Sequence, residues 1–342
     1  MRPFTYDRAE DLVQAARLGQ LTGQGQVDAP VQFLAGGTSL VDLMKLDVLT
    51  PVRLVDITPL RTAHSAIEVR PDGLRMGAFA KMSAVAAHPA VLAGYPAVAQ
   101  SLQLAASAQL RNMATLGGNV LQRTRCTYFR DTSWAACNKR NPGSGCAAMA
   151  GVNRNHAVLG VDGSCIAQYP GDWAVALVAL GTQLDLTGPQ GARRMPFADL
   201  HRPAAGQPHI ETTLRPGEVI TAFTVPSGAW TRRSVYVKVR DRASYEFAIA
   251  SAVVALDMDG GTVRQARVGL GGMAYRPWRA HAAEAALAGK PLTEANAEAA
   301  AKAALDGAVT HGQNDYKPEL GRQTVVRALM QAGAMPLTSR KA

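Results

Sequence analysis

Two glycine pairs in similar surroundings place the strongest constraint on what this chain can fold into. The first, Gly36-Gly37, lies in FLAGGTSL, and the second, Gly117-Gly118, lies in TLGGNV. Paired glycines allow positive φ angles, so consecutive backbone N–H groups can converge on one anion. The flanking threonine, serine and asparagine side chains add donors, as a pyrophosphate requires. For either pair taken alone, a simple turn at a strand end remains an alternative interpretation.

Neither loop has the GxGxxG spacing or the Walker spacing, so a Rossmann fold and a P-loop are not supported. The chain has 342 residues, enough for two or three modules with sizeable cores. Its composition, 47% hydrophobic, is that of a globular protein.

The pattern of apolar residues and breakers predicts a mixed chain. The first helix is expected over 5–19, with Asp7 as N-cap and Gly19 as its end. A strand, a glycine turn and a helix are expected over 31–45, followed by strands at 52–58 and 73–79. A long helical stretch is expected over 80–107, interrupted near Pro89 and Pro96. Residues 122–156 have no steady period and are expected to be mainly loop. There follow an expected helix over 169–181 between Asp172 as N-cap and Gly181, a strand pair over 182–200, and a strand within 214–226.

The character of the sequence changes near residue 226. Two strong strand patterns are joined at Asp259-Gly260-Gly261, which predicts a hairpin. Helices are expected over 280–289 and 293–308 and from about 319. The sequence therefore predicts an α+β N-terminal part and a smaller C-terminal part of strands followed by helices.

The net charge is +10 and the pI is about 9.7, which raises the question of nucleic acid. No lysine or arginine run exceeds two residues and no nucleic-acid module is visible, so a basic face for an acidic partner or a dinucleotide fits better. We expect no nucleic-acid binding. With no signal peptide and no apolar stretch of 18 residues, we also expect no direct membrane insertion.

All four cysteines fall within 40 residues, as Cys126-x10-Cys137-x8-Cys146-x18-Cys165. Disulfides are possible from an even count, but a large chain with no export signal does not need them. Structural zinc favours C-x2–4-C knuckles, which are absent. A cubane iron–sulfur cluster needs four thiolates, and nearby arginines and lysines (Arg123, Arg125, Arg130, Lys139, Arg140 and Arg154) would offset its charge. The spacing alone leaves these alternatives open, together with unpaired cysteines.

Six motifs taken together resemble the flavoprotein subunit of the molybdenum hydroxylases, the family of xanthine dehydrogenase, carbon monoxide dehydrogenase and aldehyde oxidoreductase. The motifs are FLAGGTSLVDLMK, LRNMATLGGNV, RMGAFAKMSAV, GDWAVALVALG, LRPGEVITAFTVP and YVKVRDRASYEFAIASAVVAL. The resemblance implies an α+β fold like that of vanillyl-alcohol oxidase (PCMH-type). It implies FAD-binding subdomains over 1–58 and 59–226 and, over 227–342, a domain like the carbon monoxide dehydrogenase flavoprotein C-terminal domain.

The resemblance also implies the residues that bind FAD. Both glycine loops would hold the diphosphate, and a few other residues would lie near the cofactor; the full set is Ala35, Gly36, Gly37, Thr38, Ser39, Leu40, Gly77, Ala78, Asn112, Thr115, Gly117, Gly118, Asn119 and Lys238. Ser39 departs from the aspartate or asparagine of many relatives, but a serine hydroxyl can still donate to a phosphate oxygen. For Lys238, a solvated strand edge is the alternative.

Most flavoprotein subunits of this family pass directly from the TxGGN loop to the next strand, whereas about 40 residues are inserted here after Asn119. The segment at about 122–166 resembles a [4Fe–4S] insertion known in the 4-hydroxybenzoyl-CoA reductases and, more closely, in the bacterial periplasmic aldehyde oxidoreductases. That resemblance implies that Cys126, Cys137, Cys146 and Cys165 are all cluster ligands.

We therefore expect the FAD-binding medium subunit of a heterotrimeric molybdenum aldehyde oxidoreductase. Its partners would be a small [2Fe–2S] subunit and a large molybdenum-cofactor subunit, and it would pass electrons through FAD to an external acceptor. No catalytic residue is expected in this chain. The resemblance implies the periplasm, reached with a partner's twin-arginine signal, and otherwise the cytoplasm. Alternatives are another molybdenum hydroxylase (hydroxybenzoyl-CoA-reductase-like or xanthine-dehydrogenase-like), a stand-alone FAD oxidase, and a zinc-stabilised scaffold.

Overall fold

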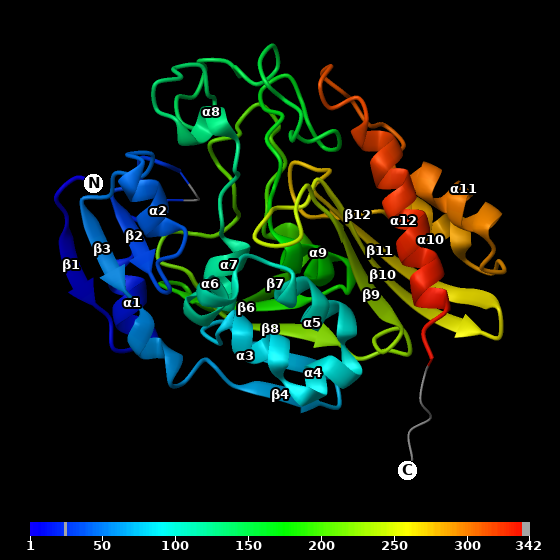
Figure 1. Cartoon of the computed structure of the whole chain (residues 1–342). Helices are drawn as coiled ribbons and strands as arrows, with labels where there is room; N and C mark the ends of the chain where they lie inside the picture. The colour runs from blue at the N-terminus through cyan, green and yellow to red at the C-terminus, as the bar shows by residue number, and fades with distance from the viewer. Residues whose placement is uncertain (24–25, 337–342) are drawn as a thin grey trace.

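The computed structural model describes residues 1–23 and 26–336, and its strands form three sheets that follow one another along the chain (Figure 1). The first sheet is parallel, in the order β1-β3-β2, with β1 (Thr5–Arg8), β2 (Val31–Leu34) and β3 (Arg53–Asp56). Two helices accompany it, α1 (Leu12–Leu18) and α2 (Leu40–Lys45). The predicted strand–turn–helix over 31–45 and the strand within 52–58 are confirmed.

The helix predicted to begin at Asp7 is wrong in its first half. Residues Thr5–Arg8 form a strand because they pair with Arg53–Asp56, a partner that a local pattern cannot reveal. The helix begins only at Leu12, and its N-cap is Asp11, whose carboxylate accepts a hydrogen bond of 2.7 Å from Gln14 N. Gly19 ends it, as predicted.

The second sheet is antiparallel, in the order β4-β5-β8-β6-β7. Its strands are β4 (Ile67–Arg70), β5 (Gly73–Gly77), β6 (Gln183–Gly188), β7 (Gly191–Pro196) and β8 (Val219–Pro226). The predicted strand pair over 182–200 corresponds to β6 and β7. Strand β8 is buried over almost its whole length because it lies at the centre of the sheet.

Short helices pack beside this sheet: α3 (Met82–Ala87), α4 (Pro89–Gly94), α5 (Pro96–Gln103), α6 (Ala108–Met113), α7 (Leu116–Val120) and α9 (Asp172–Ala179). Pro89 and Pro96 each begin a new helix, which confirms the predicted interruptions. Every residue of α9 is buried, because α9 lies between the second and third sheets. The N-cap of α9 is Gly171 and not Asp172, whose carboxylate instead pairs with Lys238.

The third sheet, in the order β12-β11-β10-β9, contains β9 (Ser234–Val239), β10 (Ala250–Asp259), β11 (Thr262–Gly271) and β12 (Trp278–Arg279). The hairpin between β10 and β11 is confirmed. Three helices follow, α10 (His281–Leu287), α11 (Glu294–Ala304) and α12 (Lys317–Gly333), and bury a second core against this sheet. Figure 1 shows α12 lying along the sheet beside α10 and α11.

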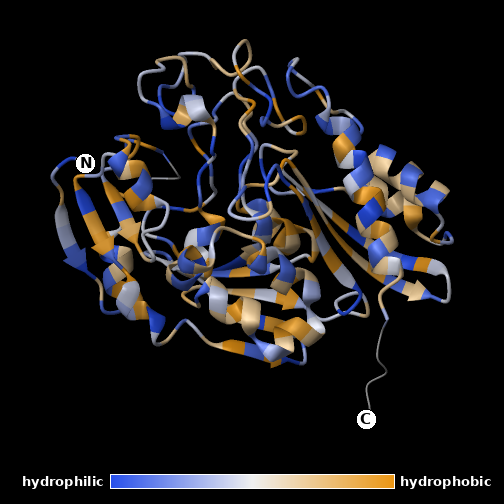
Figure 2. Cartoon of the chain, viewed as in Figure 1, coloured by the Kyte–Doolittle hydropathy of each residue, from blue (hydrophilic) through white to orange (hydrophobic). Residues whose placement is uncertain are grey.

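The cysteine segment, residues 122–166, is largely irregular, as predicted, and its one helix is the single turn α8 (Thr127–Arg130). It forms the upper part of the molecule in Figure 1. Figure 2 shows mixed colouring over this segment, whereas hydrophobic colouring is denser in the strands and helices below. Within the described residues, no helix has the length and apolar character needed to cross a membrane.

Candidate functional site

The first glycine loop connects β2 to α2 and lies directly against the start of the second loop. A Cβ added at Gly36 would stand 2.4 Å from the carbonyl oxygen of Met113, so only glycine permits this approach. Gly37 has a φ of +73°, a conformation that favours glycine. Ser39 is the N-cap of α2, yet its hydroxyl makes no capping hydrogen bond. That hydroxyl is therefore free to donate to a ligand.

The second loop is held in place by its own backbone. Gly117 N donates to Ala78 O at 2.8 Å, and Thr115 Oγ1 accepts from Gly118 N at 3.2 Å as the N-cap of α7. Gly77 has a structural role, since a Cβ there would lie 2.1 Å from His64 O. Gly77 and Ala78 support the second loop and line neither of the two cavities described next. Their contact with a cofactor stays a prediction.

Two large cavities meet at the glycine loops. We call one the Phe33 cavity and the other the Tyr245 cavity. Both open to solvent, and the empty space at each, including the solvent at its mouth, is about 1090 Å³ and about 1250 Å³. Thr38 and Ser39 line both. An elongated dinucleotide fits this arrangement, because its two halves can occupy different cavities while its diphosphate lies at the loops between them.

Most of the predicted cofactor-binding residues line these cavities. Ala35, Gly36, Gly37, Thr38, Ser39, Leu40, Thr115 and Gly118 line the Phe33 cavity, and Asn119 lines the Tyr245 cavity. The side-chain oxygen of Asn119 is buried without a hydrogen-bond partner, so it can accept a bond from a ligand donor. Asn112 is exposed and lines neither cavity.

Lys238 lies behind the wall of the Tyr245 cavity. Its ammonium donates to Asp172 Oδ2 at 2.8 Å and to Leu104 O at 3.0 Å, and its side chain is 1% exposed. The alternative of a solvated strand edge is therefore wrong. Asp172 itself lines the cavity. Burial raises the pKa of Asp172, although Lys238 and Tyr236 act in the opposite direction.

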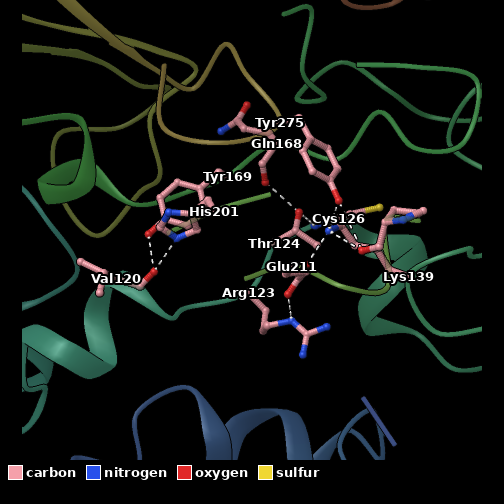
Figure 3. Close-up of polar contacts among 11 residues, drawn as sticks. Val120, Arg123, Thr124, Cys126, Lys139, Gln168, Tyr169, His201, Glu211 and Tyr275 are labelled. Atoms are coloured by element: carbon pink, nitrogen blue, oxygen red, sulfur yellow. Dashed lines mark hydrogen bonds and ion pairs between the residues drawn. The ribbon is translucent and has the colours of Figure 1, made fainter. Parts of the chain in front are cut away.

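A buried cluster of charges adjoins the Phe33 cavity (Figure 3). Arg123 and Lys139 both pair with Glu211, and Figure 3 shows the two side chains converging on this carboxylate. Burial raises the pKa of Glu211, but Arg123 and Lys139 outweigh it, so the pKa lies below its ordinary value. Lys139 Nζ also donates to Tyr275 Oη at 2.8 Å. No local sequence pattern pointed to Glu211, which joins this cluster only through the fold.

Neutral side chains complete the network in Figure 3. His201 Nε2 and Tyr169 Oη each lie 2.9 Å from the carbonyl oxygen of Val120, the last residue of α7. Burial lowers the pKa of His201 to about 4, so its ring is neutral at pH 7 and donates through Nε2. These contacts fix the end of the second glycine loop.

A second charge cluster adjoins the Tyr245 cavity. Asp42, on α2, accepts from Arg130 Nη1 at 2.8 Å and Nη2 at 3.0 Å, and from Arg125 Nη1 at 3.1 Å. The hydrogen bond from Arg130 is the main cause that lowers the pKa of Asp42. Arg125 and Arg130 belong to the cysteine segment, so this segment reaches the helix that follows the first glycine loop.

Backbone pairing in the cysteine segment brings Cys137 and Cys146 opposite each other. They form an antiparallel bridge, flanked by hydrogen bonds from Asn138 N to Gly145 O at 2.8 Å and from Ala147 N to Ala136 O at 2.9 Å. Gly143 and Gly145 have φ angles of +85° and +93°, which close this tight turn. Ten residues of irregular sequence are thus folded back to pair two thiols.

The other two cysteines approach this pair. The side chains of Cys146 and Cys165 lie close enough to affect each other: Cys165 is the main cause that lowers the pKa of Cys146 to about 6, and Cys146 is the main cause that raises the pKa of Cys165. Cys126 packs against three small apolar clusters. One contains Cys137, one contains Cys165, and Cys146 packs against the third. Burial raises the pKa of Cys126 to about 11, and His156 Nε2 lies 3.2 Å from its sulfur.

All four cysteines are free thiols, so the structure has no disulfide between them. Across residues 1–23 and 26–336, no three or more histidine, cysteine, aspartate or glutamate side chains are arranged to hold a single metal ion. The predicted cluster ligation therefore has no direct support from a preformed ion site. The four cysteines nonetheless converge from separate parts of the segment.

Comparison with known protein families gives two matches. Residues 2–228 match the FAD binding domain in molybdopterin dehydrogenase, and residues 235–332 match the CO dehydrogenase flavoprotein C-terminal domain. The first match includes both glycine loops and the whole cysteine segment. The second contains the third sheet and its helices.

Individual relatives cover nearly the whole chain. It is 43% identical over 336 residues to the aldehyde oxidoreductase FAD-binding subunit PaoB of Escherichia coli K12, covering 98% of this chain and 99% of that protein. It is 28% identical to the carbon monoxide dehydrogenase medium chain of Afipia carboxidovorans, covering 97% of each. Among solved structures, a chain of carbon monoxide dehydrogenase from Hydrogenophaga pseudoflava superposes with a TM-score of 0.73 at 27% identity, covering 97% of this chain and 98% of that one.

Proposed function

Since the chain belongs to the family of FAD-binding subunits of molybdenum hydroxylases, we propose that it is the medium subunit of an aldehyde oxidoreductase. One observation carries this proposal: two cavities meet where both glycine loops converge, in a chain that is 43% identical to an aldehyde oxidoreductase FAD-binding subunit along almost its full length. The loops offer backbone donors and glycine positions that a side chain would obstruct.

The residues around the loops fit FAD in chemistry as well as in shape. Ser39 has a free hydroxyl, Asn119 a free carbonyl oxygen, and Thr38 lines both cavities. FAD supplies a flavin that can accept electrons singly and release them in pairs. The chain's own part is to hold the diphosphate and to keep one cavity open to an external acceptor.

In this proposal the aldehyde reacts on a partner and not on this chain. A large subunit with the molybdenum cofactor would carry out that chemistry, and a small subunit with [2Fe–2S] clusters would connect it to the flavin. Substrate choice would then be a property of the large subunit.

We further propose that Cys126, Cys137, Cys146 and Cys165 together hold a [4Fe–4S] cluster. The thiolates of a cubane bind four different iron atoms, so they surround a cluster and do not converge on one point. Two buried and two half-buried thiols, amide-rich turns and nearby cations suit such a group. When bound, the cluster would supply one-electron chemistry or would only order the segment.

The visible spectrum and metal content of the purified complex test both cofactors. Flavin bands with a broad iron–sulfur shoulder, and close to four additional iron atoms beyond those of the small subunit, are expected. Cys137→Ser should remove those additional irons and leave the flavin, whereas Ser133→Ala, an exposed change in the same segment, should remove neither. Unchanged iron in the cysteine variant would refute the ligand assignment, and a protein without flavin bands would refute the function.

The compartment is also a proposal. We propose that the folded complex reaches the periplasm with a signal carried by a partner. Fractionation of cells that express all three subunits tests this, because deletion of the partner's signal should retain this chain in the cytoplasm. If the chain is cytoplasmic with the signal intact, the proposed export is wrong.

A further inference from the structure

The glycine loops carry no positive side chain, although the ligand proposed for them is a dianion. Neither Leu34–Ser39 nor Thr115–Asn119 contains a lysine or arginine. A diphosphate has a negative charge on each phosphate, and backbone N–H groups provide only partial charges against it. The positive charge must therefore come from elsewhere in the fold.

Two charge clusters lie at the two cavities, and each has one cation more than it has carboxylates. Glu211 is shared by Arg123 and Lys139, and Asp42 is shared by Arg125 and Arg130. The first cluster is buried, whereas the side chains of the second are 23% to 36% exposed. Surplus charge that is removed from water is unfavourable unless an anion compensates it, and this applies more strongly to the first cluster. Other charges at the cavities are paired or exposed: Lys238 with Asp172, Arg242 with Glu246, Arg193 with Glu218, and the exposed Arg215.

In the first cluster, Arg123 is the cation with an unused hydrogen-bond donor. Lys139 has three ammonium donors, and they face three acceptors: Glu211, Tyr275 Oη and Pro208 O. The side chain of Arg123 is only 9% exposed, and its Nη2 is buried with no hydrogen-bond partner. Arg123 lines the Phe33 cavity, and Figure 3 shows its guanidinium on the side of Glu211 away from Tyr275.

In the second cluster, Arg125 is the cation with an unused hydrogen-bond donor. Arg130 binds both oxygens of Asp42, whereas Arg125 reaches one oxygen through one nitrogen. Arg125 Nε is buried without a partner, and the guanidinium stacks over Phe247 with 4.9 Å to the ring centre. Arg125 lines the Tyr245 cavity.

We propose that Arg123 and Arg125, from the cysteine segment, are FAD-binding residues that place positive charge on either side of the diphosphate. Of these two cavities, Arg123 lines the Phe33 cavity and Arg125 lines the Tyr245 cavity, with the glycine loops between them. Arg125 also lines a third cavity, beside Cys126 and His156. The inference deepens the proposed function, since it rests on FAD lying in these cavities. It does not depend on a cluster being bound. It gives the cysteine segment a second role, because the order of this segment fixes the charge at the flavin site.

The test compares ligands with and without phosphates. FAD binding to the flavin-stripped protein is measured by fluorescence, with ADP and adenosine as competitors. Arg123→Gln and Arg125→Gln should each lower the affinity for FAD and for ADP by about tenfold, because a charge-assisted bond is lost. The affinity for adenosine should change by less than about twofold. Arg264→Gln, which removes one charge from an exposed pair with Asp259, should leave all three affinities unchanged.

Several outcomes would overturn the inference. If FAD and ADP bind both variants as they bind the unaltered protein, or if adenosine weakens as much as ADP, the arginines do not act on the diphosphate. If a variant fails to fold, the salt dependence of ligand binding to the unaltered protein tests the inference. Added salt should lower the affinity for ADP strongly and the affinity for adenosine little. Equal salt dependence would refute the inference alone, whereas no FAD binding at all would refute the proposed function as well.

Discussion

The glycine loops and the cysteine segment approach the same cavities but contribute different physical properties. The loops are short, neutral and fixed by close backbone packing, as at Gly36 against Met113. The cysteine segment is long and largely irregular, and it brings Arg123, Arg125 and Arg130 to the cavity walls. The loops thus define the shape of the site, and the segment supplies much of its charge.

This difference explains how a long irregular segment can adjoin the glycine loops without blocking the cavities. The segment is held by ion pairs to Asp42 and Glu211 and by hydrogen bonds to the C-terminal part, such as Asn153 Nδ2 to His311 O at 2.7 Å. Since those anchors lie in all three parts of the chain, the segment connects them. Changes to shape should consequently be more damaging than changes to single polar groups.

Gly36→Ala tests the shape of the site and should have the largest effect. The new Cβ would meet Met113 O at 2.4 Å, so the two loops must separate. We expect FAD affinity to fall about a thousandfold, or about 4 kcal/mol, measured by flavin fluorescence. Gly94→Ala is the matched control, because nothing lies within 4 Å of a Cβ there. Normal flavin content in the Gly36 variant would show that close approach of the loops is not required.

Lys238→Met tests whether the charged pair behind the Tyr245 cavity is structural. Removal of the ammonium leaves the buried Asp172 carboxylate without its cation, so the free energy of unfolding should fall by about 3 kcal/mol, measured by denaturant titration. The double variant Lys238→Met/Asp172→Asn should recover part of that loss. Arg264→Met, at an exposed pair, should leave the midpoint unchanged. A stable Lys238 variant with weak FAD binding would instead make Lys238 a direct ligand.

His201 predicts a pH dependence of stability at the end of the second loop. Burial lowers its pKa to about 4, while an unfolded histidine titrates near 6.5. Between pH 6.5 and 5 the unfolded state binds this proton while the folded state does not. The free energy of unfolding therefore keeps its full value above pH 6.5 and falls by about 2 kcal/mol on lowering the pH to 5.

The variant His201→Gln, which keeps a donor for Val120 O, should show a flatter stability profile over this range in thermal melts. His281→Gln, at a histidine whose side chain is 73% exposed, is the control and should keep the original profile. An unchanged slope in His201→Gln would mean that this ring is protonated in the folded protein or that other groups dominate.

Ser39→Ala should have the smallest effect, because it removes one neutral donor from a loop whose backbone stays in place. The hydroxyl makes no capping bond, so stability should be unaffected while FAD affinity falls about fivefold, or about 1 kcal/mol. Thr293→Ala, which removes the N-cap of α11, should do the reverse. If Ser39→Ala lowers stability and not affinity, the serine belongs to the helix and not to the site.

Local sequence patterns predicted much of the fold and the glycine loops. Proline and glycine restrict the backbone locally, so the helix starts at Pro89 and Pro96 and the turn at Gly260 could be read directly. Strand β1 could not, because Thr5–Arg8 is a strand only through its pairing with β3. The predicted N-caps Asp7 and Asp172 failed because tertiary partners, Arg53 and Lys238, use those carboxylates.

The charged side of the site was harder to predict than its glycine side. The arginines of the cysteine segment were expected to offset a cluster, which stays a prediction, and the structure also places Arg123 and Arg125 on the walls of the two cavities. Their orientation depends on Glu211 and Asp42, which are distant in sequence. The expected basic face for a dinucleotide was the one signal that pointed in this direction, and charge composition alone could not name its residues.

A crystal structure of the complex with FAD bound tests the central claim most directly. We predict diphosphate density between Gly36–Ser39 and Thr115–Asn119, with the guanidinium groups of Arg123 and Arg125 on opposite sides of it. Density for the diphosphate elsewhere, or both arginines turned away from the phosphates, would contradict the division of shape and charge between the glycine loops and the cysteine segment.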